Sequence, residues 1–150
     1  MSKKETHFTK EILSKEVAEI ELEKWFDTKR VRPDQRNRQN SFTGIDSSRE
    51  ALINSFVYGI LVLNEETGEL TQNLQFPLQS ENVNIDKLTI KPRITRADTN
   101  NASVGVKPTD IEGKTTAYLS AITGVPRGQL NKLDETDRSL SDIIVGYFLQ

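Results

Sequence analysis

The feature that most constrains the fold is an apolar stripe near the end of the sequence. Its members recur at i, i+3, i+4, i+7 and i+8: Leu140, Ile143, Ile144, Tyr147 and Phe148. This spacing follows the 3.6-residue turn of an α-helix and places all five side chains on one face. Asp134 or Thr136 can begin the helix, where acidic residues interact favourably with the helix dipole. The chain must bury this face, either in its own core or against another polypeptide.

A second helical segment precedes this one and ends in a corner. Two residues can cap its start, Thr109 and Asp110. Apolar residues then follow at helical spacing until Gly124, a residue type that commonly ends helices. Leu130 and Leu133 mark a short helical turn before the final helix. Residues 109–150 are therefore predicted as a helical C-terminal half.

The N-terminal third is predicted as a helix followed by a basic linker. Apolar residues between positions 8 and 28 recur at roughly helical spacing and include Trp25 and Phe26. Residues 29–49 carry six basic and two acidic residues without apolar periodicity. A phosphate-binding arm is the alternative for the most basic part of this block, residues 29–38, but that part lacks interleaved aromatic residues for stacking on bases. We predict three parts: an N-terminal amphipathic helix over 1–28, a basic linker over 29–46, and a small α+β domain over 47–150.

The middle of the chain predicts a further helix and a hairpin. Ser47 and Glu50 fit a capping box, in which each side chain binds a backbone amide of the other residue. An apolar stripe at helical spacing follows and gives way to a strand at about Ile60. The hairpin turns near Gly68, and Pro77 is expected to end its second strand because proline cannot donate to a ladder.

One more strand and a loop complete the predicted order. Apolar and polar residues alternate from Leu88 to Ile94, which predicts a half-buried strand that Pro92 restricts to an edge or a local break. Residues 98–110 are polar and are expected to form a loop. The expected fold class is α+β: a small antiparallel sheet, made of the hairpin plus one further strand, with N-terminal helices and a C-terminal helical corner.

Composition excludes several classes of function. The 150 residues include no cysteine, which excludes disulfides, zinc fingers and thiol nucleophiles. His7 is the sole histidine, and the sequence has no phosphate-binding glycine loop and no calcium loop. No unbroken apolar run suggests a signal peptide or a membrane span. We therefore expect a soluble, non-secreted, non-enzymatic protein with no catalytic residue, metal site or cofactor.

The stretch from Ala121 to Asp137 has two interpretations. It matches the rhythm of a helix-turn-helix, with a glycine at the turn and apolar residues on either side. Gly128 would then lie inside the recognition helix, where glycine costs about 1 kcal/mol relative to alanine. Asp134 and Glu135 would face the phosphates, and the chain has a net charge of −2. We therefore favour a corner between two packing helices and expect no nucleic-acid partner.

Three segments carry a family resemblance. They are Leu74-Gln-Phe-Pro77-Leu, the strand Leu88-Thr-Ile-Lys-Pro-Arg93, and the helical tail from Ile122 through Leu130, Leu133 and Asp137 to Ile143, Ile144, Phe148 and Leu149. Together they resemble the small tail assembly proteins of tailed bacteriophages, in particular the Mu-type tail assembly chaperones. In that family a short sheet-forming half precedes a helical half with a "Gly, then Leu-x-x-Leu-x-x-x-Asp" corner. The resemblance covers roughly residues 70–149, and residues 1–46 depart from it.

The resemblance implies a non-enzymatic role in the cytoplasm of the host cell. Such proteins are thought to coat the aggregation-prone tape measure protein and to help recruit tail tube subunits, so these two proteins are the implied partners. We hypothesise that two apolar helix faces bind the partner through six residues: Trp25, Phe26, Leu140, Ile144, Tyr147 and Phe148. The competing interpretation is that both faces close the protein's own core. The alternative functions are a structural component of the phage tail or baseplate, and a small helix-turn-helix DNA-binding regulator. A homo-oligomer is also compatible with the sequence.

Overall fold

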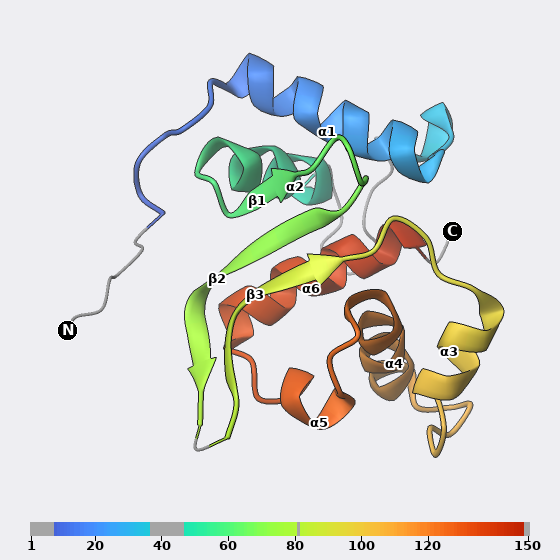
Figure 1. The fold of residues 1–150 in the computed structure, drawn as a ribbon. Helices are drawn as coiled ribbons and strands as arrows, with labels where there is room; N and C mark the ends of the chain where they lie inside the picture. Colours follow the sequence, from blue (N-terminus) through green and yellow to red (C-terminus); the bar gives the residue numbers. More distant parts are fainter. Residues whose placement is uncertain (1–7, 37–46, 81, 149–150) are drawn as a thin grey trace.

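The computed structural model describes residues 8–36, 47–80 and 82–148 and has the predicted α+β class. Within these ranges, six α-helices accompany an antiparallel sheet of three strands in the order β1-β2-β3 (Figure 1). The helices are α1 (Lys15–Lys29), α2 (Ser47–Val57), α3 (Arg96–Ala102), α4 (Ile111–Thr123), α5 (Arg127–Leu130) and α6 (Glu135–Phe148), with a short 3₁₀ turn at Pro33–Gln35. The strands are β1 (Leu61–Leu63), β2 (Leu70–Gln79) and β3 (Asn84–Ile90).

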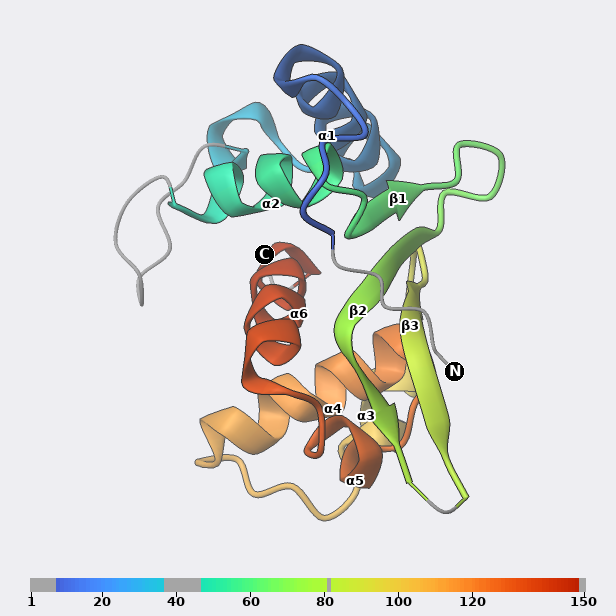
Figure 2. The same cartoon turned by 90° about the vertical axis from the view of Figure 1, so that its left-hand side faces the viewer.

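The core lies between the sheet and the helices. Helices α4 and α6 lie on one side of β2 and β3 (Figure 2). Helices α1 and α2 pack against each other at the end of the sheet where β1 lies, and α2 contacts β1. Alternate residues of β2 point inward, so Leu70 and Leu74 are buried, and Leu70 pairs with the buried Ile90 of β3. Thr71 and its partner Thr89 point the other way, and Thr71 is half-buried whereas Thr89 is exposed. The sheet therefore has one apolar face, which the helices cover.

The first helix is shorter than predicted. It begins at Lys15 instead of near residue 8, because the Ser14 hydroxyl accepts a hydrogen bond from the Val17 amide and caps the helix. The described residues before it, from residue 8 on, form neither helix nor strand, and the Ile12 amide donates to the Val57 carbonyl of α2 at 2.8 Å. Ile20 lies on the outer side of α1, so the apolar residues of this region do not form one continuous stripe.

Strand β2 continues past the proline that was expected to end it. Asn73 pairs with Lys87, but the next pair along the ladder is Leu78 with Ile85. Residues 74–77 therefore bulge out of the ladder against a single residue of β3. Pro77 lies in this bulge, where a missing backbone donor does not break a ladder hydrogen bond. The prediction that Pro77 ends the strand was wrong because a bulge accommodates it.

The region after the hairpin also departs from the prediction. The third strand ends at Ile90 instead of near Ile94, and the Lys91 amide donates to the Ile122 carbonyl at 3.0 Å. Residues 98–110 were expected to form a loop, but α3 occupies their first part. No residue of α3 is buried, so no apolar periodicity marks it. A capping box between Thr95 and Asp98 stabilises its start instead.

The other predicted elements are present. Helix α2 begins at Ser47, although the Ser47 side chain, and with it the predicted capping box, lies outside the described residues. The Asp110 carboxylate caps α4 by accepting from the Gly113 amide at 2.9 Å. Gly124 ends α4 with a φ of +78°, a left-handed conformation that favours glycine.

Candidate functional site

The six residues predicted to bind a partner lie together inside this chain. Five of them are buried, and Phe148 is partly buried against the same core. The Trp25 and Tyr147 ring centroids are 6.0 Å apart, and those of Phe26 and Tyr147 are 5.0 Å apart. The indole N–H of Trp25 is buried and meets no hydrogen-bond partner among the residues that the structure describes. These rings join α1 to α6, so partner binding through them stays a prediction that requires the two helices to separate.

The part of the basic linker that is described folds back onto α1. The Arg36 guanidinium lies 2.7 Å from a Glu23 oxygen and 3.0 Å from an Asp27 oxygen. Arg49 contacts the other oxygen of Glu23 at 3.0 Å. Val31 is buried as part of the core, and its carbonyl accepts a hydrogen bond from the Arg36 guanidinium at 2.9 Å. Two positive charges of the block, those of Arg36 and Arg49, are therefore paired with acids of α1. Residues 37–46 of the predicted linker lie outside the described residues.

Lys29 connects three elements near the end of α6. Its ammonium group lies 3.2 Å from the Phe148 ring centroid, a cation–π geometry, and donates to the Pro92 carbonyl at 3.3 Å. Burial, together with a smaller effect of the positive charge of Arg93, lowers the pKa of Lys29 from 10.5 to about 8. The contact therefore holds a partly desolvated charge between α1, α6 and the segment after β3.

A buried carboxylate joins the corner to the bulge of β2. Asp137, in the first turn of α6, is 1% exposed. One oxygen accepts from the Gln75 amide at 2.8 Å, and the other accepts from the Phe76 amide at 2.9 Å. Burial raises the pKa of Asp137, and the two amide donors oppose this shift. The carboxylate therefore satisfies two backbone donors that leave the ladder at the bulge.

A second polar contact lies beside this carboxylate. The buried Gln72 side chain donates to the Asp137 carbonyl at 2.9 Å and accepts from the Ser141 hydroxyl at 2.6 Å. We call Asp137, Gln72, Ser141 and the amides of Gln75 and Phe76 the β2–α6 latch. In the sequence, Asp137 stands out only as the last residue of the Leu-x-x-Leu-x-x-x-Asp spacing, and nothing in that spacing indicated that its carboxylate would be buried against β2.

The latch presents an aromatic side chain to solvent. Phe76 is 54% exposed, although the carboxylate of Asp137 holds its backbone amide. Strand β2 contains no charged residue over its ten positions. Other large apolar side chains that are exposed lie elsewhere on the surface: Ile12, Val17, Ile20, Val62, Val104 and Ile111. Phe76 is the aromatic member of this set among the described residues.

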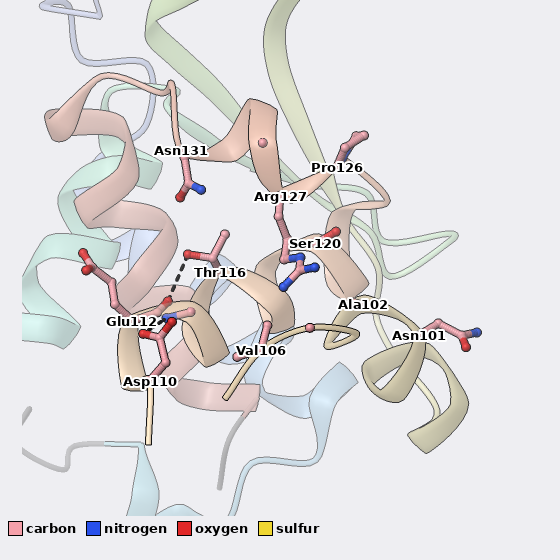
Figure 3. Close-up of a pocket in the computed structure, with 13 residues that line it drawn as sticks. Asn101, Ala102, Val106, Asp110, Glu112, Thr116, Ser120, Pro126, Arg127 and Asn131 are labelled. Atoms are coloured by element: carbon pink, nitrogen blue, oxygen red, sulfur yellow. Dashed lines mark hydrogen bonds between the residues drawn. The ribbon is translucent and has the colours of Figure 1, made fainter. Parts of the chain in front are cut away.

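An open groove lies between α3, α4, α5 and the loop that follows α3. Its volume is about 770 Å³, and most of its lining is polar (Figure 3). Asp110 and Glu112 lie toward one end, whereas the Arg127 guanidinium lies beside Ser120 and Val106. One N–H of Arg127 donates to the Val104 carbonyl and ties the loop to α5.

The helical corner does not contain a recognition helix. Helix α5 spans one turn, and the chain then turns through Asn131 into α6. Among the described residues, no three His, Cys, Asp or Glu side chains gather closely enough to hold a metal ion. No described helix has both the length and the hydropathy needed to cross a bilayer. The chain matches no known family, no curated protein and no solved structure at a significant level.

Proposed function

We propose that this chain is a non-enzymatic tail assembly chaperone of a tailed bacteriophage, which acts in the host cytoplasm on the tape measure protein or the tail tube protein. One observation carries the proposal. Two of the three segments behind the family resemblance, the leucine-proline segment of β2 and the corner that ends in Asp137, bind each other through the β2–α6 latch. These two segments therefore form one three-dimensional unit although they lie far apart in the sequence.

We propose Phe76 as the first contact with the client. The six residues named from sequence are enclosed in the chain's own core, so they are not available without a rearrangement. An exposed aromatic ring on a fixed backbone loses little conformational entropy on binding and is typical of binding hot spots. The absence of charge along β2 also matches the centre of protein interfaces, where charged residues are depleted.

The test is co-purification of the full chain with the tape measure protein and, separately, with the tail tube protein of its phage. Phe76→Glu is expected to abolish capture of the client and its protection from aggregation, because it places a charge at the anchor. Ile20→Glu is the matched control, since Ile20 is also 54% exposed but lies on the outer side of α1. Both variants should unfold at nearly the temperature of the parent chain, because neither side chain is part of the core.

The outcomes test the assignment of the binding surface to Phe76 separately from the chaperone function. Equal capture by both variants and the parent chain would contradict the assignment to Phe76. Failure of the parent chain to bind either protein would contradict the chaperone function itself. Recovery of the chain from purified mature particles would favour the alternative, a structural component of the tail or baseplate. The single turn of α5 gives a DNA-binding regulator no support.

A further inference from the structure

The groove described above has features that its role in the fold does not require. Gly105 and Gly128 line it, and a Cβ atom added at either residue would meet no other atom within 4 Å. No side chain therefore projects into the groove at these two residues, and the backbone of a ligand can approach closely there. Gly113 differs, because an added Cβ would collide with the Asp110 carboxylate that caps α4. Gly113 serves the fold, whereas nothing within the described residues fills the space beside the other two.

The chemistry of the lining points to a polypeptide ligand. Pockets for small organic molecules are lined mainly by apolar side chains, but this groove is mostly polar. The side-chain amide of Asn131 points toward it and offers both a donor and an acceptor, as peptide backbone requires (Figure 3). A polyanion such as nucleic acid would meet the carboxylates of Asp110 and Glu112 at one end.

Charge further defines the ligand. Glu112 is exposed and forms no ion pair with the rest of the described chain. Arg127 donates one N–H to Val104, and the remaining donors of its guanidinium are available to a carboxylate. We propose that the groove binds an extended polypeptide segment with a basic side chain at the Asp110 and Glu112 end and an acidic side chain at the Arg127 end. This inference is independent of the proposed function and uses a different surface from Phe76.

The probe is an array of synthetic nine-residue peptides, each with one lysine and one aspartate in an alanine–serine background, at every order and spacing. The full chain is titrated against them by fluorescence polarisation. We expect one order and a narrow range of spacings to bind at least about tenfold more tightly than the uncharged parent peptide. Glu112→Gln should remove most of the gain that the lysine contributes, and a peptide with norleucine in place of that lysine should bind both chains equally.

A steric pair of variants supplies the matched control. Gly128→Leu places a side chain in the groove, and Gly146→Leu places the same side chain on α6, away from it. An added Cβ has open space at both positions, and both glycines lie in helices, where replacement improves helix propensity. Peptide affinity should fall about tenfold or more in the first variant and change less than about twofold in the second.

Three results would overturn the inference. The first is an array in which no charged peptide binds better than the uncharged parent. The second is equal affinity of the two glycine variants for the best peptide. The third is displacement of that peptide by free lysine or glutamate at the same low concentration, which would indicate a small-molecule site. If Gly128→Leu failed to fold in a urea titration, the comparison of Glu112→Gln with the norleucine peptide would decide whether the groove binds a charged peptide. Glu112 forms no ion pair with another described side chain, so its replacement removes no ion pair from the fold.

Discussion

Replacing Asp137 with alanine is expected to destabilise the protein by about 2 kcal/mol. The substitution removes two hydrogen bonds, of 2.8 and 2.9 Å, from the amides of Gln75 and Phe76 to an ionised acceptor. Hydrogen bonds to charged groups contribute about 1.5–3 kcal/mol each. Two effects reduce the sum. In the variant, water can replace the carboxylate at the amide of the exposed Phe76. Removal of a carboxylate whose pKa is raised by burial also recovers part of its desolvation cost.

Urea unfolding followed by circular dichroism measures this change. With a slope of about 2 kcal/mol per molar urea, the midpoint should move down by about 1 M. Asp134→Asn is the control, because Asp134 is exposed and asparagine preserves its cap on the Thr136 amide. The repulsion between the Asp134 and Asp137 carboxylates, which this substitution also removes, is the smallest of the effects on the pKa of Asp137. The control should differ from the parent chain by less than about 0.5 kcal/mol.

Amide hydrogen exchange tests the same reasoning locally. In the parent chain the amides of Gln75 and Phe76 should exchange slowly, because the buried carboxylate holds both of them. In the Asp137→Ala variant these two amides should lose protection before the neighbouring ladder does. A change in stability below about 0.5 kcal/mol, together with unaltered exchange at both positions, would refute the account of the latch.

Two further predictions concern the joint between α1 and α6. The pKa of Lys29 is lower in the folded chain than the ordinary 10.5, so the folded state releases its proton first and the free energy of unfolding should rise between about pH 8 and pH 10.5. Lys29→Met should flatten that rise in a pH series of thermal melts. An unchanged slope would contradict the assignment of this pKa to Lys29. Ile144→Ala should lower the free energy of unfolding by about 2–5 kcal/mol, since Ile144 is fully buried; a loss below about 1 kcal/mol in a urea titration would mean that this face is not part of the core.

The elements that the sequence predicted well are those with strong local signals. Helix α4 has an acid cap at Asp110 and a glycine at its end, and both act as expected. The stripe of α6 gave the helix and its buried face. The α+β class followed from these helices together with the hairpin at Gly68. In each case the residues that mark an element also stabilise it locally, so pattern and structure coincide.

The departures come from interactions between distant parts of the chain. The bulge around Pro77 is held by Asp137, about sixty positions later, and no local pattern in β2 indicates it. Helix α3 has no buried residue and so no periodicity to detect. The helical spacing near the N-terminus gave no indication of where Ser14 would start α1, because apolar residues continue on both sides of it. The candidate groove likewise depends on how α3 and α5 approach α4, which only the tertiary structure defines.

The enclosed indole of Trp25 gives the protein a built-in optical probe. It is the sole tryptophan of the chain, and its N–H meets no hydrogen-bond partner in the apolar joint. Its emission should therefore lie at the short wavelengths of an indole in hydrocarbon. A client that separated α1 from α6 would expose the indole to water and shift its emission to longer wavelengths. A client that bound at Phe76 alone would leave the emission spectrum unchanged. A single fluorescence titration can thus show whether a client separates α1 from α6 or binds only at the surface.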